Sequence, residues 1–129
     1  MRNAMNVPGA PEALGPYSHA QVVRLHGGNR IVFTSGQVGL NPETKELAEG
    51  VKEQTKQALT NLATVLSGAG LTLADVVKTT VFLVDIADWA TVNEVYARVV
   101  PQPFPARSAF AVRELPKGAK VEIEAVAAV

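Results

Sequence analysis

Arg107 is the residue whose type and setting best suit chemistry on a small anion. It follows the proline-stiffened segment Phe104-Pro105-Ala106 and precedes the apolar run Ala109-Phe110-Ala111-Val112. A guanidinium beside apolar residues needs an anionic partner, and its planar fork of donors fits a carboxylate or phosphate through two parallel hydrogen bonds. Two interpretations stay open: Arg107 binds an anionic ligand, or it forms a structural salt bridge to Glu114, Glu122 or Glu124.

Glu122 is the acidic residue best placed to act on water. It lies at the start of a predicted strand, on a face that becomes apolar farther along the strand. Burial raises the pKa of a carboxyl group and a nearby arginine lowers it, so a Glu122 close to Arg107 would stay ionised and could orient a water molecule. A structural ion pair between the two residues would show the same pattern.

Three further polar positions could contact a ligand, although each also has an ordinary structural explanation. Tyr17 follows the turn Gly15-Pro16, and its phenol can donate or accept a hydrogen bond, although ordinary packing is the commoner role. Thr34-Ser35-Gly36-Gln37 ends a strand with small residues, so backbone groups there can approach a ligand closely or simply end the strand. His19 is expected at the surface. No nucleophile elbow, P-loop or dinucleotide fingerprint accompanies them.

Composition narrows the class of protein. At 129 residues and 47% hydrophobic content, we expect one domain over residues 1–129 with its own core. Twelve basic and twelve acidic residues cancel without forming a basic run, which disfavours a nucleic-acid partner. The absence of cysteine excludes disulfides and thiolate ligands, and two histidines suggest no metal site. Because no apolar run approaches membrane-spanning length, we expect no membrane partner and a cytoplasmic location.

Local patterns in the first half of the chain predict a hairpin and a helix. The β-rich runs 21–25 and 30–34 flank Gly27-Gly28, whose glycines suit a tight turn. Apolar residues then recur at three- and four-residue spacing over 51–69, which is typical of an amphipathic helix, and Gly70 is expected to cap it.

The second half adds a strand, a helix and two more strands. The β-branched run 76–84 becomes apolar on both faces, so it is expected to have neighbours on both sides. Asp88 can cap a second helix that ends before Pro101. The shared face of this helix is predicted to carry Trp89, Val92, Tyr96 and Val99. With strands from Ala106 and over 120–129, the order is ββαβαββ.

Such a sheet has one face that the chain cannot cover. Two helices cover only one side of an α+β sheet. In the final strand, Val126 and Ala128 make the second face apolar as well. Since large exposed apolar patches usually mark interfaces, we expect a homo-oligomer. The alternative is a monomer whose small residues tolerate solvent.

The chain resembles the RidA/YjgF family of imine deaminases, in motifs spread in matching order along nearly its whole length. These motifs are Gly15-Pro16-Tyr17, Thr34-Ser35-Gly36-Gln37, Asn41-Pro42, Val77-Lys78-Thr79-Thr80-Val81-Phe82, Ala90-Thr91-Val92-Asn93, Phe104-Pro105-Ala106-Arg107-Ser108, Leu115-Pro116 and Glu122-Ile123-Glu124-Ala125. The resemblance implies a chorismate-mutase-like α+β fold with two helices on one face of a mixed sheet. It also implies a homotrimer with ligand sites in the clefts between subunits.

The same resemblance implies roles for individual residues. Arg107 would clamp the substrate carboxylate, and Glu122 would position or activate the hydrolytic water. The pocket would be completed by Tyr17, Ser35, Gly36 and Asn93. The implied substrate is a reactive 2-imino acid, such as 2-aminoacrylate or 2-iminobutanoate, hydrolysed to the 2-oxo acid and ammonia without a cofactor.

The resemblance leaves two other functions to consider, and the chain differs from the family pattern at one position. Some relatives look like non-catalytic metabolite-binding or chaperone-like proteins and tend to lack the arginine, which this chain keeps. An endoribonuclease or translation inhibitor is disfavoured by the neutral charge balance. Ala109 stands where many relatives carry a cysteine, so no thiol takes part in the predicted chemistry. Hydrolysis of an imine as described needs none.

Overall fold

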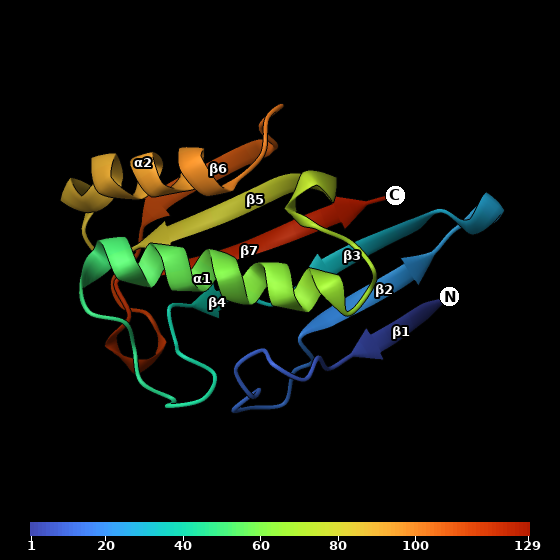
Figure 1. Ribbon diagram of the computed structural model, residues 1–129, viewed down its shortest axis with the longest axis horizontal. Helices are drawn as coiled ribbons and strands as arrows, with labels where there is room; N and C mark the ends of the chain where they lie inside the picture. The colour runs from blue at the N-terminus through green and yellow to red at the C-terminus, as the bar shows by residue number, and fades with distance from the viewer.

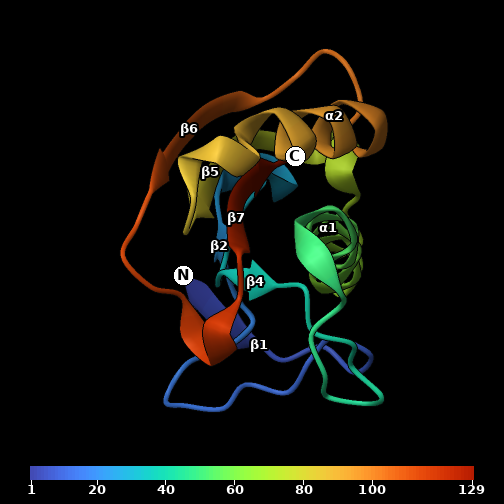
Figure 2. The same ribbon diagram turned by 90° about the vertical axis from the view of Figure 1, so that its left-hand side faces the viewer.

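The computed structural model describes residues 1–129, and two helices lie across one face of its sheet (Figures 1 and 2). The elements are β1 (Arg2–Met5), β2 (Ala20–Arg24), β3 (Arg30–Thr34), β4 (Gln37–Val38), α1 (Gly50–Ser67), β5 (Val76–Leu83), α2 (Trp89–Val99), β6 (Ala106–Ala111) and β7 (Val121–Ala128). Short 3₁₀ turns occur at His26–Gly28, Leu73–Asp75, Ile86–Asp88 and Pro116–Gly118. The predicted α+β class is confirmed. Neither helix is long and apolar enough to cross a membrane.

The seven strands form one mixed sheet. Their order is β1-β2-β3-β7-β5-β6, and β4 pairs with β7 beside β3. β5 and β6 are parallel and are connected through α2, whereas the other pairs are antiparallel. β5 therefore has a neighbour on each side, as its pattern predicts. This central position matters because β5 is registered with β6 on one side and with β7 on the other.

The apolar face of α1 packs on the sheet much as predicted. Its buried residues are Gln54, Thr55, Ala58, Leu59, Asn61, Leu62, Val65 and Leu66. The helix ends at Ser67, and Gly70 follows with a φ of 75°, a conformation that costs glycine little. The amide of Leu71 then donates to the carbonyl of Leu66 at 3.0 Å. The turn expected at Gly70 is thereby confirmed.

Two details of α2 differ from the prediction. Asp88 precedes the helix but forms no capping hydrogen bond, because its backbone is already helical (φ −82°, ψ −2°) rather than extended. Asp85 instead accepts from the amide of Ala87 at 2.9 Å and caps the 3₁₀ turn leading into α2. On the helix face, Val95 is buried, whereas Val99 ends the helix and is 37% exposed.

Two short strands were not predicted from the sequence. β1 lacks β-branched residues and pairs only through its backbone, as an edge strand on β2. β4 follows the break at Ser35-Gly36, where β3 ends as expected, and pairs with the start of β7. Backbone pairing of this kind leaves no hydrophobic pattern from which to predict it.

The face of the sheet opposite the helices is uncovered. On β7, Ile123 and Ala125 belong to the buried core, whereas Ala128 on the other face is exposed. Phe33, which is registered with Val126, is 46% exposed. The second apolar face predicted for β7 is therefore present, and no part of the chain folds over it.

Candidate functional site

The guanidinium of Arg107 lies against two aromatic rings of α2. Its central carbon is 5.0 Å from the ring centre of Trp89 and 4.9 Å from that of Tyr96. Cation–π contacts of this kind are worth about 0.5–2 kcal/mol each, depending on exposure. They hold the side chain in place without using its hydrogen-bond donors, which therefore stay available to a ligand.

Arg107 has no carboxylate partner within the chain. The three salt bridges join Lys45 to Glu12, Lys56 to Glu53 and Arg98 to Glu94. The structural salt bridge to Glu114, Glu122 or Glu124 left open by the sequence is thus absent. Arg107 instead lines a cavity of about 340 Å³ between α2 and the approach to β6. The other lining residues are Asn93, Tyr96, Ala97, Phe104 and Pro105.

A buried hydrogen bond fixes the aromatic ring nearest to Arg107. The hydroxyl groups of Tyr96 and Thr79 lie 2.7 Å apart, and both residues are at most 4% exposed. Thr79 is also the residue of β5 that is registered with Arg107 on β6. The bond therefore ties α2 to the sheet at the level of the guanidinium.

The carboxylate of Glu122 lies against the backbone of Gly36. A Cβ atom added to Gly36 would lie 2.2 Å from Oε2 of Glu122, so any larger residue would force the Glu122 side chain to move. Burial, and secondly the nearby carboxylate of Glu124, raises the pKa of Glu122 above its usual value. Arg107 does not contribute to this pKa within one chain, so the arrangement with Glu122 close to Arg107 is not formed there.

The register of the strands explains that separation. Arg107 is aligned with Thr79, and Glu122 is aligned with Phe82, three residues along β5. Since alternate residues of a strand point to opposite faces, the two side chains lie on opposite sides of the sheet. Arg107 is on the side of the helices, and Glu122 is on the uncovered side.

Two buried polar residues of α1 position the backbone around Gly36. The amide of Asn61 donates to the carbonyls of Val38 and Leu40, at 3.0 and 2.8 Å. The side-chain oxygen of Gln54 accepts from the amide of Lys120 at 2.8 Å, just before β7 begins. Because these helix residues are seven positions apart, they share one face and hold both strands that bring Gly36 to Glu122.

Tyr17 and Ser35 lie on the same side of the molecule as Gly36. Tyr17 is 49% exposed and lines one cavity of about 360 Å³ with Gly36 and another of about 350 Å³ with Ser35. The hydroxyl of Ser35 donates to the carbonyl of Ser18 at 2.6 Å, which ties the loop of Tyr17 to the end of β3. The predicted residues thus form two groups, Arg107 with Asn93 and Glu122 with Tyr17, Ser35 and Gly36.

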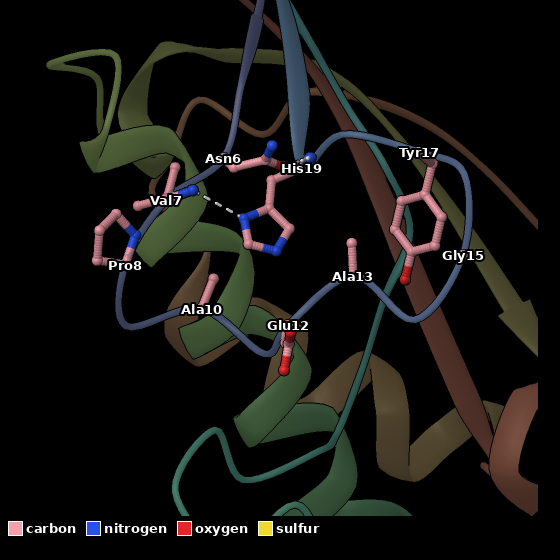
Figure 3. A pocket seen from close by; sticks show the side chains of 9 residues that line it. All are labelled: Asn6, Val7, Pro8, Ala10, Glu12, Ala13, Gly15, Tyr17 and His19. Carbon is pink, nitrogen blue, oxygen red and sulfur yellow. Dashed lines mark hydrogen bonds between the residues drawn. The ribbon is translucent and has the colours of Figure 1, made fainter.

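His19 is buried, contrary to the expectation from sequence. It is 4% exposed, and its Nδ1 accepts from the amide of Val7 at 2.9 Å (Figure 3). Its Nε2 lies 2.8 Å from the carbonyl of Pro11. Together with Asn6 and Tyr17 it lines a cavity of about 510 Å³. Both ring nitrogens are occupied, so His19 holds the N-terminal loop together. No three His, Asp or Glu side chains come close enough to hold a metal ion.

Residues 7–129 match the family described as Endoribonuclease L-PSP. The chain belongs to this family. Among curated L-PSP relatives, the human protein named 2-iminobutanoate/2-iminopropanoate deaminase is 46% identical over 128 residues, which are 98% of this chain and 90% of that protein. The resemblance to the RidA/YjgF family drawn from the motifs is confirmed.

Solved structures of L-PSP relatives share the fold. The YjgF gene product of E. coli has a TM-score of 0.87 at 41% identity, with 97% of each chain covered. A protein of Thermotoga maritima, described as a putative endoribonuclease, has a TM-score of 0.91 at 42% identity, covering 100% of this chain and 98% of that one.

Sequence reasoning missed the residues that hold Arg107 and the backbone around Gly36 in place. Trp89 and Tyr96 were expected only as core residues of a helix face, although two aromatics seven positions apart near an arginine could have indicated a cation–π pair. Gln54 and Asn61 interrupt the apolar face of α1 at the same spacing. A polar residue on a buried helix face is the signal that could have found them.

Proposed function

We propose that this chain is a deaminase that hydrolyses reactive 2-imino acids, such as 2-aminoacrylate and 2-iminobutanoate, to 2-oxo acids and ammonia. That it is an enzyme is supported by curated relatives at 44–50% identity, which are named deaminases. Such a reaction needs an anion clamp and an oriented water more than it needs a nucleophile. We expect the protein to be located in the cytoplasm.

The observation that carries this proposal is the state of Arg107. Its guanidinium is held by Trp89 and Tyr96, lines a cavity and has no carboxylate partner in the chain. An arginine fixed in this way fits the carboxylate of a 2-imino acid through two hydrogen bonds. The carboxylate is then held while the adjacent C=N carbon faces water.

Glu122 would supply the proton transfer. As a carboxylate it accepts a proton from water while the water oxygen bonds to the imine carbon, and it returns that proton to the imine nitrogen. In the resulting carbinolamine, Glu122 carries the hydroxyl proton to the amino nitrogen, so the C–N bond breaks, ammonia leaves and the C=O bond of the oxo acid forms. A carboxyl group whose pKa is raised is the better proton acceptor near neutral pH.

Arg107 and Glu122 are brought to one substrate only if two copies of the chain meet, because they lie on opposite faces of the sheet. The uncovered face supports this assembly. It exposes Phe33, and large apolar side chains exposed together on one face usually mark an interface. We propose a homotrimer with sites between subunits.

The test is a coupled assay in which an amino-acid oxidase or threonine dehydratase generates the imine and oxo-acid release is followed. Arg107→Ala is expected to lower activity about 10²–10³-fold, since one preorganised donor set is lost. Glu122→Gln is expected to lower it about 10²-fold, since the proton acceptor is lost. Circular dichroism confirms that each variant is folded. A wild-type protein inactive on every imine tested would overturn the proposal.

Mixing the two inactive variants tests the shared site. In randomly assembled trimers of Arg107→Ala and Glu122→Gln chains, about a quarter of the sites combine the intact Arg107 of one chain with the intact Glu122 of its neighbour. Activity should therefore recover to about that fraction of wild type. If the mixture stays inactive although native mass spectrometry shows mixed trimers, both residues act from one chain and the intersubunit site is wrong.

A further inference from the structure

Lys117 lies in the 3₁₀ turn Pro116–Gly118, shortly before β7 and Glu122. Its backbone is left-handed, with a φ of 59°, and Gly118 follows with a φ of 69°. A residue with a side chain is strained in this conformation, because its Cβ lies close to the following carbonyl oxygen. Strained positions of this kind persist where the surrounding structure imposes them, and they cluster at ligand sites.

Lys117 lines a cavity that borders the Glu122 half of the proposed site. This cavity of about 360 Å³ is shared by Tyr17, Gly36 and Pro116. The carboxylate of Glu122 touches Gly36, which forms part of the cavity wall. Lys117 is the one lysine among the residues that line this cavity. The proposed hydrolysis gives it no role.

Lys117 has no anionic partner in the chain. None of the three salt bridges includes it. Glu12 lines the same cavity, but its carboxylate lies 3.9 Å from Nζ of Lys45. Because Glu12 is already paired, although loosely, the ammonium of Lys117 is the charge left to meet an anion that enters the cavity.

We propose that Lys117 is a specificity-determining residue that binds a second, distal carboxylate of the substrate. The preferred substrates are then 2-imino acids with two carboxylates. This inference rests on the proposed function, in which Arg107 of another copy takes the carboxylate next to the imine carbon. A lysine, with one compact charge on a flexible stem, suits a distal group whose position varies with chain length. The hydrolytic step is unchanged.

The test compares imines made in situ from glutamate and from alanine. In the wild type, kcat/KM is expected to be higher for the dicarboxylic imine. Lys117→Gln should lower it about tenfold for that imine, because a charge-assisted contact is lost, and about twofold or less for the monocarboxylic one. Lys117→Arg should restore the preference. Lys45→Gln is the matched control, since Lys45 is also left-handed (φ 63°) but is paired with Glu12, and it should leave the preference unchanged.

A binding measurement separates failure of this inference from failure of the proposed function. Calorimetry with the stable products 2-oxoglutarate and 2-oxobutanoate needs no turnover. Tighter binding of 2-oxoglutarate that is lost in Lys117→Gln supports the role of Lys117 even if no imine is hydrolysed. Equal binding of the two oxo acids, or equal loss for both imines in Lys117→Gln, overturns it while leaving the deaminase proposal intact.

Discussion

The Arg107 cleft and the Glu122 pocket are built in opposite ways. In the cleft, a cation is held by two aromatic rings and has no carboxylate near it. In the pocket, a carboxylate lies against a glycine backbone, and burial and the carboxylate of Glu124 raise its pKa. Neither the guanidinium of Arg107 nor the carboxylate of Glu122 therefore forms a salt bridge within the same chain.

This difference teaches how such a site can be assembled. The strand register of β5 places the two charges on opposite faces, where they cannot neutralise each other within a chain. A salt bridge between Arg107 and Glu122 in the free subunit would need to be broken before a substrate could bind. Because the sheet separates them, Arg107 and Glu122 stay unpaired within one chain. In the proposed assembly, Arg107 of one copy meets Glu122 of another.

Gly36→Ala should break the Glu122 pocket and leave the Arg107 cleft intact. The added methyl would overlap Oε2 of Glu122, so we expect a loss of about 1–3 kcal/mol in the free energy of unfolding and a marked fall in kcat. Urea unfolding and the coupled assay measure both. In a Glu122→Ala background the clash is removed, so the same substitution should then cost little. An equal cost in both backgrounds would mean that the crowding is not with Glu122.

Tyr96→Phe should weaken the Arg107 cleft without removing its ring. The substitution leaves the buried hydroxyl of Thr79 without its partner at 2.7 Å, so we expect a loss of about 1–2 kcal/mol in unfolding free energy. KM should rise only a few-fold, because the cation–π contact with the ring persists. Thr79→Val in the Tyr96→Phe background removes the orphaned hydroxyl and should recover part of the stability. A large fall in kcat with KM unchanged would contradict this role.

Glu124→Gln should have the smallest effect on activity of the three substitutions, and it tests how Glu124 influences the pKa of Glu122. Glu124 raises the pKa of Glu122, so its neutralisation should lower that pKa. Because Glu122 must be ionised to accept a proton, activity falls as pH drops through its pKa. The acidic limb of the pH profile should therefore move to lower pH in Glu124→Gln. A limb that stays in place would show that Glu124 does not act on Glu122 in the assembled protein.

The elements with strong periodicity could be predicted from the sequence, and those made by backbone pairing could not. The helix predicted over 51–69 and the interior strand predicted over 76–84 have apolar residues at the spacing of their elements, and both elements are present in the structure. β1 and β4 have no such pattern.

The candidate site could likewise be predicted only in part from the sequence. Arg107 and Glu122 were identified by residue type and motif, but their separation depends on strand register, which no local pattern specifies. The burial of His19 was missed because its partners, the amide of Val7 and the carbonyl of Pro11, are backbone groups of a loop. Such partners leave no signature in the side chains of the sequence.

The connection of β5 to β6 through α2 has a consequence for the order of folding. Every group that forms the Arg107 cleft comes from the continuous segment 76–111, so the cleft closes over a short loop. The Glu122 pocket joins β4 to β7 and needs contacts between residues far apart in the chain. Contacts over shorter loops form faster, so the cation site can be complete while the strand bearing Glu122 is still unpaired.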